Sequence, residues 1–190
     1  MVKEKIIGDK GKVLLNGKVY YYKRNDAYVE ILGERIADFF NLHHACYTPI
    51  TYNGLNYYLS EDLNSKGEFK TGFDIGFESY DFNKLLELVQ TRFNDNSIIN
   101  DLYKMYFMDL MILNIDRNSD NYGFLTNQDK TTLYILDHGS CFLDYTCLLT
   151  SIQNKPDKSS LLEIDHILRN FDEEHYNMFL EMYKSLDLDT

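Results

Sequence analysis

A long apolar segment followed at once by a run of polar residues constrains the fold of this chain more than any other feature. Residues 98–113 predict a helix that is apolar on nearly every side. Its apolar residues are Leu102, Met105, Phe107, Met108, Leu110, Met111 and Ile112. Such a helix has to be buried at the centre of a lobe. The polar run that follows, residues 114–121, therefore forms a loop at the end of a buried helix, and it carries Asp116 and Asn121.

Two short strands follow this loop and bring a third polar residue to it. Residues 122–126 and 131–136 are rich in residues that favour sheets, and the turn at 127–130 joins them. This pairing places Asn121 and Asp137 at adjacent strand ends. Phosphoryl transfer from ATP uses such a set, because one carboxylate orients the attacking hydroxyl while a carboxamide and a second carboxylate hold Mg²⁺ on the phosphates.

The N-terminal residues predict a three-stranded antiparallel meander over residues 5–23. Its strands are expected at 5–7, 13–15 and 18–23. Asn16-Gly17 is the dipeptide preferred in a two-residue hairpin turn, since both central residues there need φ > 0. The first turn contains Gly8 and Gly11. It could cover phosphate groups with its backbone N–H groups, or it could be an ordinary β-turn, and both interpretations stay open.

A helix over residues 25–40 follows the meander. Its buried stripe consists of Val29, Leu32, Ile36 and Phe40. Lys23 ends the strand just before this helix. A lysine that holds the α- and β-phosphates of ATP is positioned by a carboxylate on the next helix. Lys23 and Glu30 are therefore predicted to form this pair, with Glu34, four residues further on the same face, as the second candidate.

Two further antiparallel strands, at 45–50 and 55–59, precede a segment at 60–63 where the chain leaves the sheet. In a two-lobed kinase this is where adenine would meet the backbone, so Glu61 and Leu63 are candidate contacts. An ordinary surface exit explains the same residues. The remaining segments are predicted as a loop at 64–76 and as helices at 82–93, 161–171 and 173–185.

The charge of the chain excludes some classes of partner. Thirty acidic and 19 basic residues give a formal net charge of −11. A surface for nucleic acid or an anionic membrane would be basic, so we expect neither as a direct partner. The three cysteines show no C-x-x-C spacing, and no apolar run reaches the roughly 18 residues of a membrane span. Since no apolar leader is recognised either, we expect a reduced, cytoplasmic protein.

His43, His44 and Cys46 bring metal-binding side chains close together in the sequence. Zinc sites of this kind usually take a second pair of ligands at a similar spacing, and no second pair follows. We therefore interpret these residues as a loop at the end of a helix.

The order of these features resembles the protein-kinase-like fold. Within it, residues 107–125 are most similar to the HipA-like kinases, the toxin-type serine/threonine kinases of bacteria. Their catalytic stretch has an Asn, then Asp-x-His, then an Asn and an apolar strand, and the phosphatidylinositol-kinase-like families share a related Asp-Arg-His-x-x-Asn. The matching positions are Asn114 for the leading Asn, Asp116 for the catalytic Asp, Asn121 and Asp137 for the metal-binding residues, Lys23 for the ATP lysine and Glu30 for the helix acid.

The resemblance implies an α+β fold with two lobes. Residues 1–62 would form an N-terminal lobe with a five-stranded antiparallel sheet and one helix. Residues 63–190 would form a mainly helical C-terminal lobe with the catalytic loop 114–121 and the metal-binding segment 137–139. It also implies ATP and Mg²⁺ as cofactors and a protein serine or threonine as the phosphate acceptor. A role as the toxin of a toxin–antitoxin system would add an antitoxin or accessory subunit as a partner.

Three departures from the family pattern keep other functions open. Asn118 stands in place of the family's His, the phosphate loop lacks the Ser-rich form, and the N-terminal subdomain of full-length HipA proteins has no counterpart. A nucleotide-binding pseudokinase or partner-binding module is one alternative, and a kinase for a small molecule is another. All the polar positions that a working site needs are present, which favours a serine/threonine protein kinase-like phosphotransferase.

Overall fold

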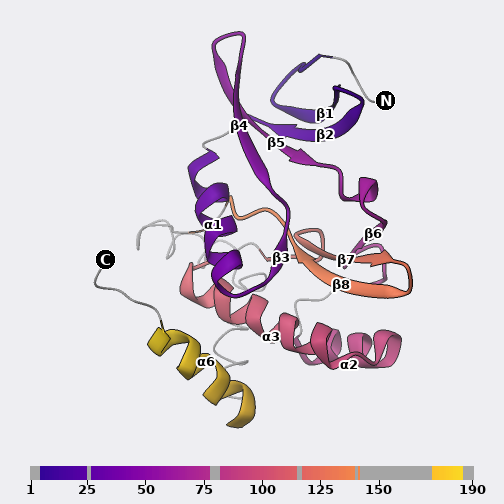
Figure 1. Ribbon diagram of the computed structural model, residues 1–190, viewed down its shortest axis with the longest axis vertical. Coiled ribbons are helices and arrows are strands. Elements are labelled where there is room, and N and C mark those ends of the chain that lie inside the picture. Colours follow the sequence, from indigo (N-terminus) through magenta and orange to yellow (C-terminus); the bar gives the residue numbers. More distant parts are fainter. Residues whose placement is uncertain are drawn as a thin grey trace, which may run out of the picture.

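The computed structural model of the chain describes residues 5–24, 27–77, 82–114, 117–139, 141 and 173–185 (Figure 1). The helices in these residues are α1 (Ala27–Phe39), the short 3-10 helix η1 (Leu63–Ser65), α2 (Phe82–Phe93), α3 (Asn96–Met111) and α6 (Glu173–Ser185). The strands are β1 (Lys10–Leu15), β2 (Lys18–Lys23), β3 (His43–His44), β4 (Tyr47–Tyr52), β5 (Leu55–Glu61), β6 (Glu68–Thr71), β7 (Tyr122–Asn127) and β8 (Lys130–Ile135).

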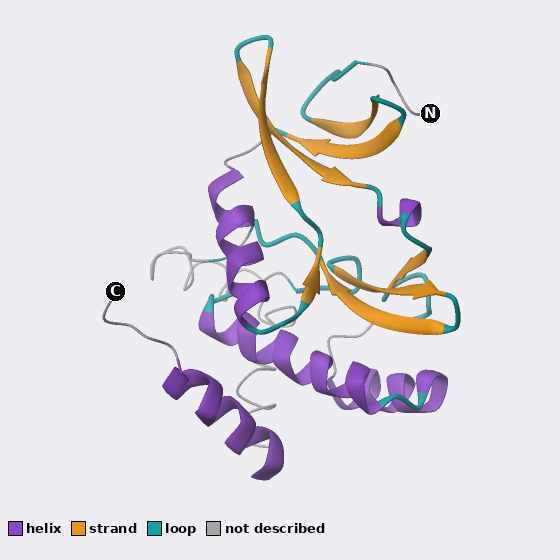
Figure 2. Cartoon of the chain, in the orientation of Figure 1, coloured by secondary structure: helices purple, strands orange, loops and turns teal. Residues whose placement is uncertain are grey.

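The strands form two four-stranded sheets, one in each lobe (Figure 2). The N-terminal sheet has the order β1-β2-β5-β4 and is antiparallel throughout. The C-terminal sheet has the order β3-β8-β7-β6, and only β3 runs parallel to its neighbour. Helices α2, α3 and α6 lie on the side of the C-terminal sheet that faces away from the N-terminal sheet. The predicted α+β fold with two lobes is confirmed.

The prediction of a fifth strand in the N-terminal sheet, over residues 5–7, is wrong. The hydroxyl of Tyr22 donates to the Ile7 carbonyl at 2.7 Å and accepts from the Ile7 N–H at 3.1 Å, so a side chain takes the place of a strand partner. The chain then turns at Gly8, whose φ is +81°, before β1 begins. Ile6 and Ile7 are therefore an apolar pair that lies beside the sheet, although the sequence alone predicts a strand there.

Two strands that the sequence did not indicate complete the C-terminal sheet. Strand β6 lies inside the predicted loop 64–76 and pairs with β7. It is short, and its residues Glu68 and Lys70 are exposed, so it lacks the apolar alternation that predicts a strand. Strand β3 has only two residues, which is too few for any periodic signal.

The predicted helices at 82–93 and 173–185 are confirmed, and the helix predicted at 161–171 lies outside the described residues. The central helix α3 begins two residues earlier than predicted, because the Asp95 side chain accepts a hydrogen bond from the Ser97 N–H at 2.8 Å and caps it. None of the helices in the described part of the chain is long and apolar enough to cross a membrane.

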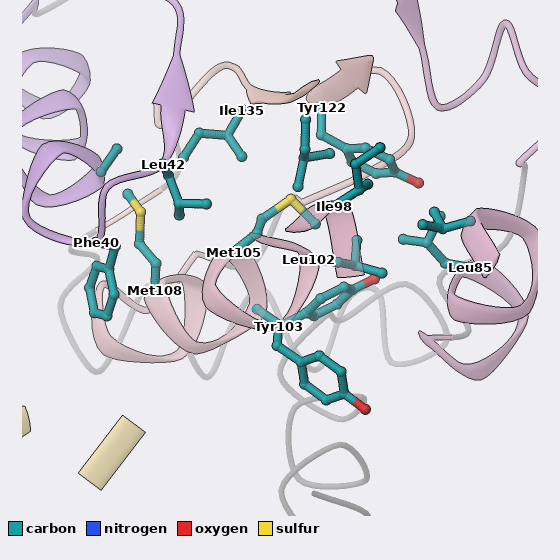
Figure 3. Close-up of a cluster of buried hydrophobic side chains, with 14 of the residues drawn as sticks. Phe40, Leu42, Leu85, Ile98, Leu102, Tyr103, Met105, Met108, Tyr122 and Ile135 are labelled. Carbon is teal, nitrogen blue, oxygen red and sulfur yellow. The ribbon is translucent and has the colours of Figure 1, made fainter. Parts of the chain in front are cut away.

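Helix α3 is the centre of the main hydrophobic core, as predicted (Figure 3). Its Leu102, Met105 and Met108 are fully buried between the C-terminal sheet and the neighbouring helices. Phe40 and Leu42, which follow α1, enter the same core, so the helix of the N-terminal lobe is anchored in the C-terminal one. The N-terminal sheet has a smaller cluster of its own, made of Ile6, Val13, Tyr22, Tyr57 and Leu59.

A buried Arg117 joins α3 to the C-terminal sheet. Its Nε and Nη2 atoms each donate to the carboxylate of Asp109 in α3, both at 2.9 Å. Its Nη1 atom donates to the backbone carbonyls of Asn121 and Leu136, both at 2.6 Å. Both charged side chains are 1% exposed. We call this arrangement the Arg117 clamp, because it fixes the chain just before β7 and just after β8.

Helix α1 crosses the chain after β8 at very close range. A Cβ atom added at Gly33 would lie 2.6 Å from the Cβ atom of His138, a distance that real Cβ contacts do not reach. The His138 side chain is fully buried there, and its ring also packs edge-on against Tyr47 with 6.4 Å between ring centroids. Gly33 therefore allows α1 to approach the segment at 137–139.

Replacing Arg117 by Met should strongly destabilise the protein, because the Asp109 carboxylate would be left buried without its partner. Breaking a buried ion pair in this way lowers the free energy of unfolding by about 3–5 kcal/mol. The double variant Asp109→Leu/Arg117→Met removes both charges, so it should lose less stability than the two single variants added together. Urea denaturation of the four proteins measures this coupling, and additive losses would contradict the clamp.

Replacing Gly33 by Ala should destabilise the protein, although Ala is the better helix former by about 1 kcal/mol. The added methyl group would meet the buried His138 side chain, and overpacking of this kind lowers the free energy of unfolding by about 1–3 kcal/mol. Arg35→Ala, at an exposed position of the same helix, is the control and should change stability little. A Gly33→Ala protein at least as stable as the wild type would disprove the close approach.

Candidate functional site

A cleft of about 720 Å³ lies between the two lobes. It is lined by strands β1 and β2, by the segment that follows β5, and by the ends of β7 and β8. The predicted site residues that line it are Lys23, Gly11, Glu61, Leu63, Asn121 and Asp137. Gly8 and Glu30 are not among the lining residues. Asp116 lies outside the described residues.

Asp137 and Lys23 meet in this cleft although they are far apart in the sequence. Lys23 Nζ donates to Asp137 Oδ2 at 3.3 Å, and both side chains remain partly exposed, at 38% and 42%. Partial burial raises the pKa of the Asp137 carboxyl, but the Lys23 ammonium and the Gly139 N–H outweigh this effect and bring the pKa below its ordinary value. The carboxylate is therefore ionised at neutral pH, as a metal ligand has to be.

The backbone at Asp137 is held in an uncommon conformation. Its φ is +48°, in the left-handed region, which few residues other than Gly adopt. Its N–H donates to the Tyr47 hydroxyl at 2.8 Å, and its Oδ1 accepts from the Gly139 N–H at 3.2 Å. Such strain persists only where the surroundings impose it, and it concentrates at functional sites.

Glu30 supports this segment from beneath the cleft. It is 1% exposed, its Oε2 accepts from the His138 N–H at 2.7 Å, and its Oε1 accepts from the Tyr58 hydroxyl at 3.0 Å. The expected ion pair with Lys23 is not formed, because the Lys23 ammonium bonds to Asp137 instead. Glu30 nevertheless lies close by, since a Cβ atom at Gly139 would be 3.2 Å from Glu30 Oε1 and 3.7 Å from Lys23 Nζ.

Two tyrosines that sequence reasoning missed belong to the same network. The Tyr47 and Tyr58 rings meet edge-on, with 5.4 Å between their centroids. Burial, followed by the nearby Glu30 carboxylate, raises the pKa of each hydroxyl, so both stay protonated and can donate. Aromatic residues are common in strands, so the sequence gives no signal that sets these two apart.

The loop before β7 holds Asn121 at the floor of the cleft. Its N–H donates to the Asn118 carbonyl at 2.9 Å, and its own carbonyl accepts from Arg117 and from the Leu136 N–H. Asn118 shapes the turn as well, because its Oδ1 accepts from the Asp120 N–H at 2.9 Å. The residue that replaces the family's His therefore supports the loop through its side chain.

The segment after β5 forms a short bridge between the lobes. Asp62 donates its N–H to the Val19 carbonyl at 3.1 Å and caps η1 by accepting from the Asn64 N–H at 3.1 Å. Its Oδ2 also accepts from Lys12 Nζ at 3.2 Å, and the Asp62 side chain is only 14% exposed. Leu63 is buried at the start of η1, where the first N–H groups of a helix have no intrahelical partner.

The predicted phosphate-covering turn differs from its expected form. Gly11 already belongs to β1, and a Cβ atom there would lie 2.8 Å from the Tyr22 hydroxyl. Gly11 therefore makes room for Tyr22 at the edge of the cleft. The turn itself is made at Gly8 and Asp9, which do not line the cleft.

The cleft has the groups that a nucleotide with a magnesium ion would need. Lys23 provides a cation for phosphate oxygens, and Asn121 and Asp137 provide the hard oxygen ligands that Mg²⁺ prefers. The size of the cleft suits a small-molecule site. Arginine and glutamate groups buried behind it, in the Arg117 clamp and at Glu30, fix the backbone that carries these residues.

Comparisons with known proteins find likenesses among solved structures. No protein-family model and no curated protein matches the chain. The Helicobacter pylori proinflammatory kinase CtkA is 18% identical with a TM-score of 0.60, covering 78% of this chain and 62% of its own. A chain from the Shewanella oneidensis MR-1 toxin–antitoxin complex of HipA, HipB and operator DNA is 13% identical with a TM-score of 0.56, covering 94% of this chain.

This chain spans 62% of the length of each of those two chains. At such identities a likeness shows the fold and nothing finer. The order of the elements, the inter-lobe cleft and these two likenesses agree. The chain has the two-lobed protein-kinase-like fold, of the kind found in HipA-like kinases.

Proposed function

We propose that the protein is an ATP- and Mg²⁺-dependent phosphotransferase that acts on a serine or threonine hydroxyl of a protein. The observation that carries the proposal is the meeting of Lys23, Asn121 and Asp137 in one cleft between the lobes. Lys23 Nζ and Asp137 Oδ2 lie 3.3 Å apart. This arrangement supports the proposal, because phosphoryl transfer needs a cation for the phosphates close to oxygen ligands for Mg²⁺.

In this proposal each part of the cleft has a role. Asn121 and Asp137 hold Mg²⁺, Lys23 contacts the phosphates, and the backbone at Glu61 and Leu63 meets the adenine. When bound, Mg²⁺-ATP supplies the phosphoryl group and Mg²⁺ neutralises its charge. Glu30 positions the metal-binding segment through the His138 N–H and does not bind Lys23 directly.

Asp116 would orient the acceptor hydroxyl and take its proton. The residues on either side of positions 115 and 116 are held firmly: Asn114 Nδ2 donates to Asp109 Oδ1 at 2.8 Å, and Arg117 bonds to the same carboxylate. For this role, Asp116 has to come within hydrogen-bond reach of the acceptor hydroxyl, as proton transfer requires in general.

The acceptor and the partners are inferred from the likeness to HipA. We propose a protein substrate, an antitoxin or accessory subunit as partner, and a cytoplasmic location. Neither nucleic acid nor membrane is proposed as a direct partner, because the chain is strongly acidic. The pseudokinase and the small-molecule kinase are alternatives that the experiments below distinguish.

Asp137→Asn should weaken the binding of Mg²⁺ with a non-hydrolysable ATP analogue. Asn keeps the left-handed backbone but removes the charge that binds Mg²⁺. We expect the affinity for the Mg²⁺–analogue complex to fall by roughly 10- to 100-fold. Losses of this size follow even when only the residues that hydrogen-bond to the metal ligands are changed. Isothermal titration measures this affinity, and Asp129→Asn, in the exposed β7–β8 turn, is the matched control because its φ is also positive.

Equal affinity in wild type, Asp137→Asn and Asp129→Asn would remove Asp137 from the magnesium site. Equal affinity for the ATP analogue with and without Mg²⁺ would contradict the proposed dependence on Mg²⁺.

Asp116→Asn should abolish transfer of label from γ-labelled ATP while leaving nucleotide binding in place. Loss of a general base lowers the rate by roughly 10²–10⁴-fold. The assay incubates the protein with Mg²⁺-ATP, alone and with a bacterial lysate, and phosphoamino acid analysis tests for labelled serine or threonine. Asp129→Asn is again the control.

Label in a small, acid-soluble product, lost in Asp116→Asn, would replace the protein acceptor by a metabolite. Nucleotide binding without any transfer would point to the pseudokinase. A fully active Asp116→Asn protein would refute the assignment of the base.

A further inference from the structure

Three metal-binding side chains come together on the outside of the cleft, between α1 and the start of β4. The ligand atoms of Glu34, His44 and Cys46 all lie within 4.8 Å of one another. These three residues do not line the cleft between the lobes. We propose that this Glu34–His44–Cys46 cluster binds a zinc-type transition-metal cation, which is a function beyond the phosphotransfer proposed above.

The surroundings of His44 suit a metal ligand. Its side chain is only 8% exposed, so its position is set by the fold. Nδ1 lies 3.0 Å from the Ala45 carbonyl oxygen, and Nε2 lies 3.0 Å from Asp38 Oδ1. The ring nitrogen that binds the metal would give up its present oxygen contact, and the other nitrogen would keep an oxygen acceptor for its N–H. A metal-binding histidine almost always donates its second N–H to a carbonyl or carboxylate, and this bond fixes the ring.

The kind of ligand indicates the kind of metal. A thiolate with an imidazole and a carboxylate is a typical ligand set for Zn²⁺, whereas Mg²⁺ and Ca²⁺ prefer oxygen ligands alone. Atoms bound to one tetrahedral Zn²⁺ lie about 3.3–3.6 Å apart. The ligand atoms would therefore have to move closer together by up to about 1.5 Å to close around the ion. Cys46 is exposed, so the cation can enter from solvent and a water molecule can complete the shell.

The Glu34 carboxylate still has lone pairs available for a metal ion. Glu34 Oε2 accepts from the Tyr47 N–H at 3.2 Å, which leaves the other carboxylate oxygen and further lone pairs for a metal. Binding replaces the proton of the Cys46 thiol by the cation and releases this proton to solvent.

The position of the cluster explains what the metal would do. Glu34 belongs to α1, His44 to β3 and Cys46 to the short link between β3 and β4, so one ion would join α1 to this part of the chain next to Tyr47. The Tyr47 backbone bonds to Glu34, and its hydroxyl bonds to the Asp137 N–H. A metal at this site would therefore stabilise the elements that hold the Asp137 segment.

In the test, the full chain is purified in the presence of a chelator. It is then titrated first with Co²⁺ and afterwards with Zn²⁺, in the absence of nucleotide. We expect one equivalent of Co²⁺ to give a thiolate-to-cobalt charge-transfer band, and Zn²⁺ to displace it. Cys46→Ser should abolish the band, and His44→Gln should weaken Co²⁺ binding at least tenfold. His43→Gln is the matched control, because His43 is the neighbouring histidine and its ring stacks on Tyr134 instead.

A second measurement keeps the proposal testable if one variant folds poorly. Zn²⁺ should raise the thermal unfolding midpoint of the wild type and of His43→Gln, and not that of Glu34→Gln, which retains an oxygen for the Tyr47 N–H. The absence of a charge-transfer band in the wild type, or equal Co²⁺ binding by Cys46→Ser, would overturn the site. Because no nucleotide is present, either result is independent of whether the phosphotransfer proposal holds.

Discussion

The buried ion pair between Arg117 and Asp109 is the interaction on which the cleft depends. Burial alone would lower the pKa of the guanidinium, but the Asp109 carboxylate more than offsets this, so Arg117 stays charged inside the core. Two desolvated charges are tolerated only when their hydrogen bonds are complete. The two Nη1 donors of Arg117 are used by the Asn121 and Leu136 carbonyls. The same bonds that satisfy the charge therefore set the spacing of Asn121 and Asp137.

A second group of buried polar atoms, in the N-terminal lobe, also fixes the backbone that lines the cleft. Glu30 accepts from the Tyr58 hydroxyl and the His138 N–H, while Tyr47 accepts from the Asp137 N–H. These bonds hold the left-handed backbone at Asp137, and Gly33 lets α1 come close enough to make them. Residues 137–139 are thus held between two buried carboxylates, one from each lobe, and the Asp137 carboxylate itself lines the cleft.

The parts of this site that follow from local sequence could be predicted, and the parts that depend on distant contacts could not. Asn121 and Asp137 flank two strands joined by a turn, so their proximity follows from the order of the residues. The place of Lys23 at the end of a strand before a helix indicates a phosphate lysine, but it does not reveal the residue that holds it. Its true partner, Asp137, lies 114 residues away, and Glu30 turned out to support the backbone instead. Tyr47 looks like any strand aromatic, and only the contacts of its hydroxyl reveal its role.

The acidic side chains of the cleft would favour a nucleotide that binds together with a cation. Its lining has five acidic residues, Glu61, Asp62, Asp74, Asp120 and Asp137, and three basic ones, Lys10, Lys12 and Lys23, and the chain as a whole carries a formal charge of −11. A nucleoside triphosphate is itself a polyanion, so without a cation it would be repelled by these carboxylates. Two of the lysines are already paired, Lys12 with Asp62 and Lys23 with Asp137. If the cleft holds a nucleotide as proposed, a Mg²⁺ ion that enters with it would release Lys23 for the phosphates and balance the carboxylate that Lys23 leaves.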